Sequence, residues 1–314
     1  MLPVSVIIPT CDRPVALVRT IRSLLASTDV PEEFIIIDAS AGHESAEAVV
    51  GLFAHPGAPR LNLRRAVKTG AAAQRNQGAV RATCDFVLFC DDDIICEPDC
   101  LALLWQAMAA DETLGGVGAA IVNQSYVRPG GATRAVLSMI GVREGEGYDG
   151  RVVGPAVNFL PRAAASVAAT PVEWLNLACT LYRRALLPDP PLDAFFTGYS
   201  LGEDVTLSLR VAQKAKLANV SAARIFHDSQ PGAHKASVVG LSRMQLVNRH
   251  YIMTQVMGRR KARDYLKLML WECFQLAASA FRDRLGRDFR QMVRGRVLGV
   301  SDLLHGRASK AVSS

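Results

Sequence analysis

The stretch FVLFCDDDIICEPD, residues 86–99, places three consecutive aspartates directly after a run of apolar side chains. The apolar run predicts a buried strand, because it is short, continuous and followed by polar residues. Adjacent carboxylates repel one another, so three of them at a strand end indicate a positively charged partner. Mg²⁺ and Mn²⁺ bind carboxylate oxygens, commonly one or two of them together with substrate phosphates. We therefore expect a cation site here, with an acidic turn that caps the next helix as the alternative.

The three aspartates are not expected to act alike. Side chains alternate along an extended chain, so Asp91 and Asp93 are predicted to point one way and Asp92 the other. His227 follows a short β-like run in RIFHD and is a candidate third ligand of the cation. The alternative for this histidine is a core or capping residue.

Strands and helices alternate around this stretch. Strands are predicted over 4–9, 33–38, 61–67 and 85–90, and helices over 14–27, 44–53, 71–82 and 99–110. The pattern predicts an α/β fold with a doubly wound, mainly parallel sheet flanked by helices. In such sheets ligands bind beyond the carboxyl ends of the strands, where residues 10–13, Asp38 and the three aspartates lie.

The second half of the chain is less regular. A strand is predicted over 117–122, and a region interrupted by Gly and Pro follows over about 123–172, a length typical of segments that set specificity. Ordered structure is expected again over 174–187, in a helix that begins at residue 203, and in a strand-like piece over 220–228. We predict two parts, a catalytic domain over 1–239 and a helical, basic C-terminal extension over 240–314.

Charge is distributed unevenly along the 314 residues. The net charge is +7; residues 240–314 hold 15 Lys/Arg and 5 Asp/Glu (+10), so residues 1–239 carry −3. The N-terminus lacks the features of a secretory signal, and the seven cysteines are scattered without a CxxC pair. We expect a cytoplasmic protein with buried, reduced thiols.

The most apolar segment of the extension is YLKLMLWECFQLAASAF, residues 265–281. No stretch of eighteen residues is free of charge, so a membrane-spanning helix is not expected. Its polar residues fall on one stripe at helical spacing, and the opposite face is broad and apolar. Such a helix suits either the interface of an anionic membrane or docking onto the catalytic domain, and both alternatives stay open. Nucleic acid is not an expected partner, because no aromatic stacking platforms accompany the basic residues.

A second acidic element is Glu203-Asp204, at the start of the predicted helix. Carboxylates at a helix N-terminus offset the dipole, which would account for both residues. A carboxylate held near a reacting carbon can instead remove a proton from an attacking hydroxyl, as a general base.

Upstream polar residues are candidates for binding a nucleotide. In PTCDR, Thr10 and Asp12 can hydrogen-bond a base or ribose, although such turns are common. In QRNQG, Arg75 can clamp a phosphate with its planar guanidinium, and the alternatives are a solvated helix residue for Arg75 and a local backbone contact for Asn76. No GxGxxG motif follows the first strand, so a dinucleotide fold of that class is not expected.

These landmarks, in this order, resemble the inverting family 2 glycosyltransferases of the GT-A fold. The resemblance runs from Val4 to about Asp228 through VSVIIPTCDRP, IIIDAS, TGAAAQRNQGAVRATCDFVLFCDDD, GYSLGEDVTLSLR and IFHD. It implies donor contacts from Pro9, Thr10, Asp12, Arg13, Asp38, Arg75, Asn76, Asp91 and Asp92. It further implies that Asp91, Asp93 (of the DXD motif) and His227 bind Mg²⁺ or Mn²⁺, that Asp204 is the base, and that Glu203 supports it. The chain departs from the family pattern at Asp12, Ala39 and Asn176-Leu177, so neither base nor acceptor identity carries over.

The resemblance implies a hexosyltransferase-type enzyme that works by a single displacement with inversion. Its partners would be a nucleotide-diphosphate sugar, a saccharide or lipid-linked acceptor and an anionic membrane surface, and its role the synthesis of cell-surface polysaccharide or glycolipid. One alternative is a nucleotidyltransferase acting on sugar phosphates, although PTCDRP is not the glycine-rich basic loop expected of that class. The other is a non-catalytic, membrane-associated protein that binds nucleotide sugars.

Overall fold

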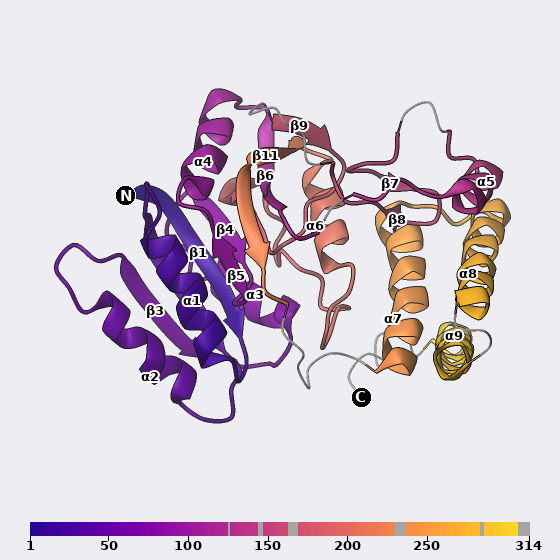
Figure 1. Cartoon of the computed structure of the whole chain (residues 1–314), viewed down its shortest axis with the longest axis horizontal. Coiled ribbons are helices and arrows are strands. Elements are labelled where there is room, and N and C mark those ends of the chain that lie inside the picture. Colours follow the sequence, from indigo (N-terminus) through magenta and orange to yellow (C-terminus); the bar gives the residue numbers. More distant parts are fainter. Residues whose placement is uncertain (125, 144–146, 163–168, 230–236, 283–285, 307–314) are drawn as a thin grey trace.

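The computed structural model describes residues 1–124, 126–143, 147–162, 169–229, 237–282 and 286–306 (Figure 1). Its centre is a nine-stranded sheet with the strand order β3-β2-β1-β4-β10-β6-β11-β5, and β9 pairs with β11. The C-terminal helices gather at the opposite end of the molecule from β3 and α2, as Figure 1 shows. The prediction of an α/β fold with a sheet flanked by helices is confirmed.

The first half of the chain follows the predicted alternation. Its elements are β1 (Leu2–Thr10), α1 (Pro14–Leu25), β2 (Pro31–Asp38), α2 (Glu44–Val50), the 3₁₀ turn η1 (Gly51–Phe53), β3 (Arg60–Arg65), α3 (Ala71–Ala79) and β4 (Phe86–Cys90). The four strands are parallel, so their carboxyl ends meet at one edge, and Thr10 pairs with Asp38 there. This edge is where the sequence places the candidate ligands.

The second half of the sheet is mixed. It contains β5 (Ile94–Cys96), α4 (Cys100–Ala110), β6 (Leu114–Ile121), β9 (Ala169–Val172), β10 (Cys179–Arg183) with the 3₁₀ turn η3 (Arg184–Leu186), α6 (Glu203–Val211) and β11 (Lys216–His227). Strand β10 runs antiparallel between β4 and β6, and β5 and β9 are antiparallel to β11. The first half of the sheet is thus wholly parallel, as predicted, whereas the second half combines the parallel pair of β6 and β11 with these antiparallel pairings. Hydrophobicity predicts a buried strand but not its direction, which depends on how the intervening chain returns.

Alternate residues of the central strands fill two separate cores. Val6 and Ile8 of β1 pack with helices α1, α2 and α4 on one face of the sheet. Ile7, between them, packs on the other face with residues of α3 and α6. This division follows from the two-residue period of a strand, and it explains why both faces of these strands are apolar.

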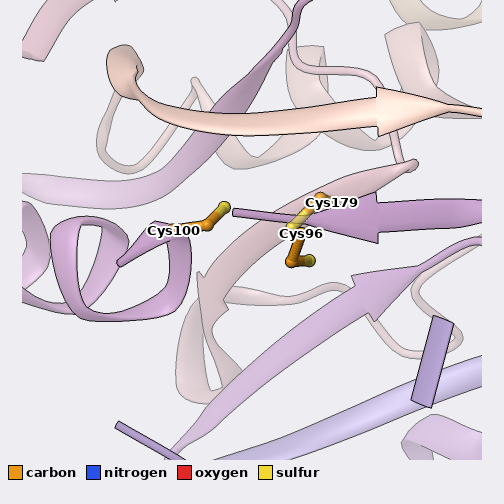
Figure 2. Close-up of side chains that lie close together, drawn as sticks. All are labelled: Cys96, Cys100 and Cys179. Carbon is orange, nitrogen blue, oxygen red and sulfur yellow. The ribbon is translucent and has the colours of Figure 1, made fainter. Parts of the chain in front are cut away.

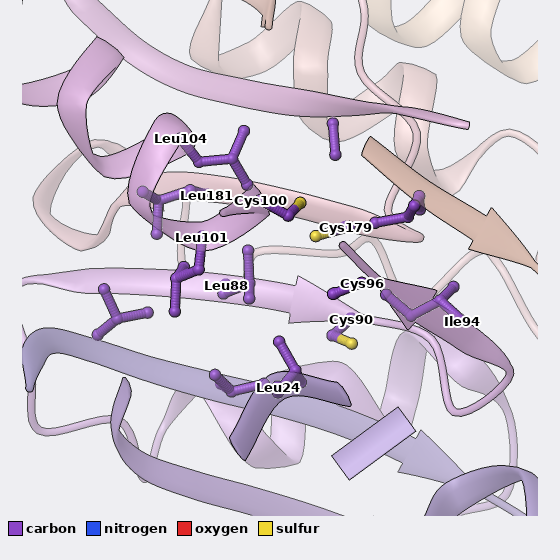
Figure 3. Close-up of a cluster of buried hydrophobic side chains, with 14 of the residues drawn as sticks. Leu24, Leu88, Cys90, Ile94, Cys96, Cys100, Leu101, Leu104, Cys179 and Leu181 are labelled. Carbon is purple, nitrogen blue, oxygen red and sulfur yellow. The ribbon is translucent and has the colours of Figure 1, made fainter. Parts of the chain in front are cut away.

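Five of the seven cysteines are buried and all seven are free thiols. Cys96, Cys100 and Cys179 place their sulfur atoms within 4.8 Å of one another (Figure 2). Leucine and isoleucine side chains surround them in the first core (Figure 3). Burial raises the pKa of the neighbouring Cys90 thiol. We interpret the group as small apolar side chains in a core, which agrees with the prediction of buried, reduced thiols.

The region over 123–172 forms part of a small separate layer. Helix α5 (Gly131–Met139) and the hairpin of β7 (Val152–Val153) with β8 (Val157–Asn158) pack around Trp271 of the C-terminal helices. The predicted irregular region thus contains local structure that its weak periodicity did not indicate, and residues 125, 144–146 and 163–168 of it lie outside the described residues.

The C-terminal part is helical, as predicted. It consists of α7 (Val238–Tyr251), a π-helical turn η4 (Ile252–Val256), α8 (Ala262–Arg282) and α9 (Arg287–Leu304). Among the described residues no helix is both long and apolar enough to cross a membrane. The proposed division of the chain at residue 240 stays a prediction.

Candidate active site

A cavity of about 500 Å³ opens beyond the carboxyl ends of β1 and β4. It is lined by ten of the thirteen site residues predicted from the sequence: Pro9, Thr10, Arg13, Arg75, Asp91, Asp92, Asp93, Glu203, Asp204 and His227. These residues come from segments more than 200 positions apart in the chain. The tertiary structure therefore brings most of the predicted site together in one place.

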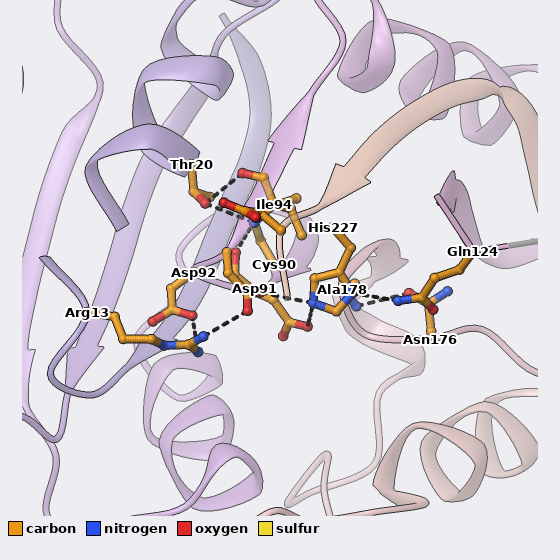
Figure 4. Close-up of polar contacts among 12 residues, drawn as sticks. Arg13, Thr20, Cys90, Asp91, Asp92, Ile94, Gln124, Asn176, Ala178 and His227 are labelled. Carbon is orange, nitrogen blue, oxygen red and sulfur yellow. Dashed lines mark hydrogen bonds and ion pairs between the residues drawn. The ribbon is translucent and has the colours of Figure 1, made fainter. Parts of the chain in front are cut away.

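Asp91, Asp93 and His227 form the centre of this cavity. Their candidate ligand atoms all lie within 4.8 Å of one another. The pairing of β5 with β11 causes this arrangement, because it sets His227 opposite Ile94, directly after the acidic turn. Thr20 of α1 anchors the same point by hydrogen bonds to the backbone N–H and C=O of Ile94 (Figure 4).

The imidazole of His227 is held on both sides. Its Nε2 lies 3.0 Å from Asp93 Oδ1 and 3.9 Å from Asp91 Oδ2. Its Nδ1 lies 3.2 Å from Nε2 of Gln124, and the side chain of Asn123 bonds to the backbone N–H and C=O of the histidine. The hydrogen bond to Asp93 raises the pKa of His227. The sequence did not single out Gln124, and the only signal was its place just after the strand that ends at residue 121.

Asp92 points away from this centre, as the alternation predicted. Its carboxylate accepts hydrogen bonds from Thr10 Oγ1 at 2.7 Å and from Arg13 Nη2 at 2.5 Å, and the residue is 1% exposed. Burial raises its pKa to about 7, while Arg13 and Thr10 oppose the shift. Asp92 thus holds the loop after β1 in place, and its contact with the donor stays a prediction, since it also lines the cavity.

Arg13 bridges the two neighbouring aspartates. Its Nη1 lies 2.8 Å from Asp93 Oδ2 while Nη2 binds Asp92. The desolvation that burial imposes lowers the pKa of Arg13, but the two carboxylates outweigh it and the net shift is upward. The guanidinium therefore stays charged and keeps a cationic group beside the carboxylate cluster, even with no other cation bound.

Arg75 is buried between two further carboxylates. It forms ion pairs with Glu203 at the start of α6 and with Asp91 in the acidic turn. Burial raises the pKa of Glu203, although the adjacent Arg75 pulls it down. The sequence-based expectation was a phosphate clamp, and the structure places this guanidinium on protein carboxylates. Arg75 thus links helix α6 to the acidic turn.

Asp204 lies one residue further along α6. The helix begins directly after Gly202, whose left-handed backbone (φ 91°) ends the preceding loop. Asp204 Oδ1 accepts the N–H of Val205 at 2.7 Å. Burial raises the pKa of Asp204 to about 6. A carboxylate with a pKa near neutrality, in a cavity and at a rigid helix start, is suited to accept a proton.

Asp12, Asp38 and Asn76 are the predicted residues that lie outside the cavity lining. Asp12 accepts the N–H of Ala41 and so ties the β1 loop to the loop after β2. Asp38 Oδ1 accepts hydrogen bonds from Ser40, while its buried Oδ2 lies 4.0 Å from Arg65 Nη1 and accepts no hydrogen bond from the described residues.

The amide of Asn76 makes two hydrogen bonds to the backbone of Leu192. Its Nδ2 donates to the C=O of Leu192 at 2.7 Å and its Oδ1 accepts the N–H of the same residue at 2.8 Å. The side chain thus anchors a distant loop, and the donor contact expected of Asn76 stays a prediction. Asn176, which the sequence marked only as a departure from the family pattern, does line the cavity.

Comparison with known proteins finds a family match for the N-terminal part of the chain. Residues 5–147 match the family model described as Glycosyl transferase family 2. These residues, fewer than half of the chain, therefore form a domain of the glycosyl transferase family 2 type. No curated protein matches the sequence at a significant level.

The fold of the chain resembles solved structures at low sequence identity. One is GalNAc-T7 with UDP, GalNAc and Mn²⁺, at 16% identity and a TM-score of 0.55, covering 81% of this chain and 47% of that one. Another is the mannosyltransferase PcManGT from Pyrobaculum calidifontis in complex with GDP-Man and Mn²⁺, at 15% identity and a TM-score of 0.57, covering 96% of this chain and 87% of that one. This chain thus spans about half of the first neighbour's length. The fold is of the GT-A type, as the resemblance implied.

Proposed function

We propose that the chain is a divalent-metal-dependent glycosyltransferase that moves a sugar from a nucleotide-diphosphate sugar to an acceptor hydroxyl with inversion. The observation that carries this proposal is the shared cavity, which Asp204 lines together with Asp91, Asp93 and His227. The family 2 domain supports it, as do the nucleotides and Mn²⁺ in the two structural neighbours.

The residues present fit a hard divalent cation. Asp91 and Asp93 offer carboxylate oxygens and His227 offers an imidazole nitrogen, all within 4.8 Å. Oxygen and imidazole donors in this combination suit Mn²⁺ or Mg²⁺. When bound, the ion would neutralise charge on the donor's diphosphate and stabilise it as a leaving group.

The side chains of the protein supply the other catalytic and positioning roles in this proposed reaction. The Asp204 carboxylate takes the proton of the acceptor hydroxyl, which attacks the anomeric carbon from the face opposite the diphosphate, so configuration inverts. Glu203 and Arg75 position this machinery, because their ion pairs join the helix that carries Asp204 to the turn that carries Asp91. Pro9 and Thr10 border the donor's place in the cavity, and Asp38 Oδ2, which accepts no hydrogen bond from the described residues, is a candidate acceptor for an N–H of the base.

The wider role is also a proposal. We propose transfer of a hexose to a saccharide or lipid-linked acceptor in the synthesis of cell-surface polysaccharide or glycolipid, at the cytoplasmic side of a membrane. The Asn176-Leu177 segment borders the cavity where an acceptor would enter.

A donor screen tests the proposal directly. A nucleoside diphosphate with Mn²⁺ is expected to raise the melting temperature, because a ligand at 100 times its Kd stabilises the folded state by about 2.7 kcal/mol. Omitting Mn²⁺ should remove most of the shift. Incubation with a nucleotide sugar should then release the nucleoside diphosphate. Formation of a nucleotide sugar from a nucleoside triphosphate and a sugar phosphate would instead identify a nucleotidyltransferase.

The pH dependence of the reaction should report the proposed base. Asp204 has a pKa of about 6 and accepts a proton only when ionised, so the carboxylate form is lost as pH falls through that value. We expect kcat/KM to fall about tenfold per pH unit well below pH 6 and to level off about one unit above it. Initial rates at a fixed concentration of Mn²⁺ measure this profile. A flat profile between pH 5 and 7 would contradict the assignment.

A further inference from the structure

Helix α8 buries Leu268 and Trp271 but exposes a second set of apolar side chains. Its exposed residues with described side chains are Ala262, Arg263, Tyr265, Leu266, Met269, Leu270, Cys273, Ala277 and Phe281. Arg263 is the only charged residue among them. At about 100° per residue the other eight, which we call the α8 face, fall within a sector roughly 160° wide. Leu266 is 53% exposed, Met269 61% and Phe281 87%.

Two polar side chains of α8, Glu272 and Ser279, point inward. Glu272 is 7% exposed and forms ion pairs with Arg249 of α7 and Arg296 of α9. Ser279, two turns further along, is 3% exposed. Rotating the helix to bury its apolar side would move Glu272 away from both guanidinium groups, leaving buried charges uncompensated. The buried ion pairs therefore fix the outward orientation of the α8 face.

A continuous exposed apolar surface of this kind needs a partner. Single exposed apolar residues are common on soluble proteins, but a helix face made of them marks an interaction surface. The described part of the chain does not cover these residues, since each of the eight is exposed in it.

The surroundings of the α8 face are strongly basic. The run GRRKAR, residues 258–263, leads directly into it, and its four cationic residues are exposed. A groove of about 1470 Å³ borders the start of the helix. Its lining includes eight cationic residues, Arg143, Arg151, Lys214, Lys216, Arg259, Lys261, Arg263 and Lys267, and three acidic ones, Glu112, Glu173 and Asp264.

We propose that the α8 face and the run 258–263 dock the protein onto an anionic lipid bilayer, with α8 lying in the membrane interface. An apolar face with cations at its border is the pattern of an interfacial helix, in which the apolar side enters the headgroup boundary and the cations meet anionic lipid. A second copy of the chain suits the surface less well, because it would bring another basic run and groove to the same contact. The proposal is independent of the proposed transferase activity.

Vesicle flotation of the full chain, with no donor or acceptor present, tests the proposal. The protein is expected to float with vesicles of phosphatidylcholine mixed with phosphatidylglycerol, and about tenfold less with phosphatidylcholine alone. Added salt should weaken the binding, because it screens the attraction between the basic run and the lipid. Failure of the unmodified protein to float with the anionic vesicles would overturn the proposal.

Matched variants locate the contact. Leu266→Glu with Met269→Glu should lower the vesicle-bound fraction at least about tenfold, because two exposed apolar side chains that would enter the bilayer are replaced by charges. The control is Val50→Glu with Val80→Glu, which adds the same charge at exposed apolar positions (53% and 79%) of α2 and the end of α3. This control should bind vesicles like the unmodified protein, and melting curves verify that both variants fold.

Two further results would refute the proposal, one if the protein floats with vesicles and the other if it forms a dimer. Equal vesicle binding by the α8 variant and the control would place the contact elsewhere. A dimer that the α8 variant dissociates in sedimentation, without vesicle binding by the unmodified chain, would assign the α8 face to a second copy.

Discussion

Replacing Asp204 by Asn is expected to lower turnover by about 10²–10⁴-fold, the range that general base catalysis typically contributes. Asn keeps the shape of the side chain and its ability to accept the N–H of Val205, so α6 should begin as before. What is lost is the capacity to take a proton from the acceptor hydroxyl. Donor binding should persist, because the proposed diphosphate contacts lie on the acidic turn. Turnover assays combined with calorimetric titration of nucleoside diphosphate and Mn²⁺ separate the two effects.

A matched control is available on the same fold. Asp85→Asn makes the same change at a side chain that is 88% exposed, just before β4 and outside the cavity lining. It should leave both turnover and donor affinity unchanged. If Asp204→Asn turned over donor at a near-normal rate, or lost donor binding altogether, Asp204 would not be the base.

Replacing Asp93 by Asn should weaken Mn²⁺ binding by at least about 100-fold. Substituting residues that merely support metal ligands typically costs 10–100-fold in affinity, and a direct ligand should cost no less. Asp93 also lies 3.0 Å from His227 Nε2 and 2.8 Å from Arg13 Nη1, so its loss leaves the imidazole less well oriented. Titration of Mn²⁺ in the presence of nucleoside diphosphate measures the affinity, and activity should fall in parallel.

The adjacent aspartate provides the comparison. Asp92→Asn makes the identical substitution one residue away, at a carboxylate that faces Thr10 and Arg13. We expect it to lower thermal stability and to change Mn²⁺ affinity far less than Asp93→Asn does. Similar losses of Mn²⁺ affinity in the two variants would mean that the acidic turn acts as a diffuse negative patch and not as a defined site.

Much of the candidate site followed from the sequence. Strand ends and helix starts are encoded locally, so the positions of Asp91 to Asp93 after β4 and of Asp204 at the start of α6 could be predicted. What each polar group contacts could not. Arg75 was expected on phosphate and lies on Glu203 and Asp91, because the partner of a buried guanidinium is set by segments distant in the chain.

The same contrast applies to the sheet. The apolar runs that form β1, β2 and β4 were predictable because both faces of each strand are buried. The antiparallel insertion of β10 between β4 and β6 was not, since strand direction leaves no periodic signal. Strand β5 was also missed, since it is only three residues long.

The C-terminal helices show most clearly which features the sequence determines and which depend on tertiary structure. By itself the sequence determined that residues 265–281 form a two-sided helix, because polar and apolar residues separate at a period of 3.6. Only the tertiary structure decided which side faces out. Arg249 and Arg296 supply the charges that make a buried Glu272 stable, so the apolar side is left exposed.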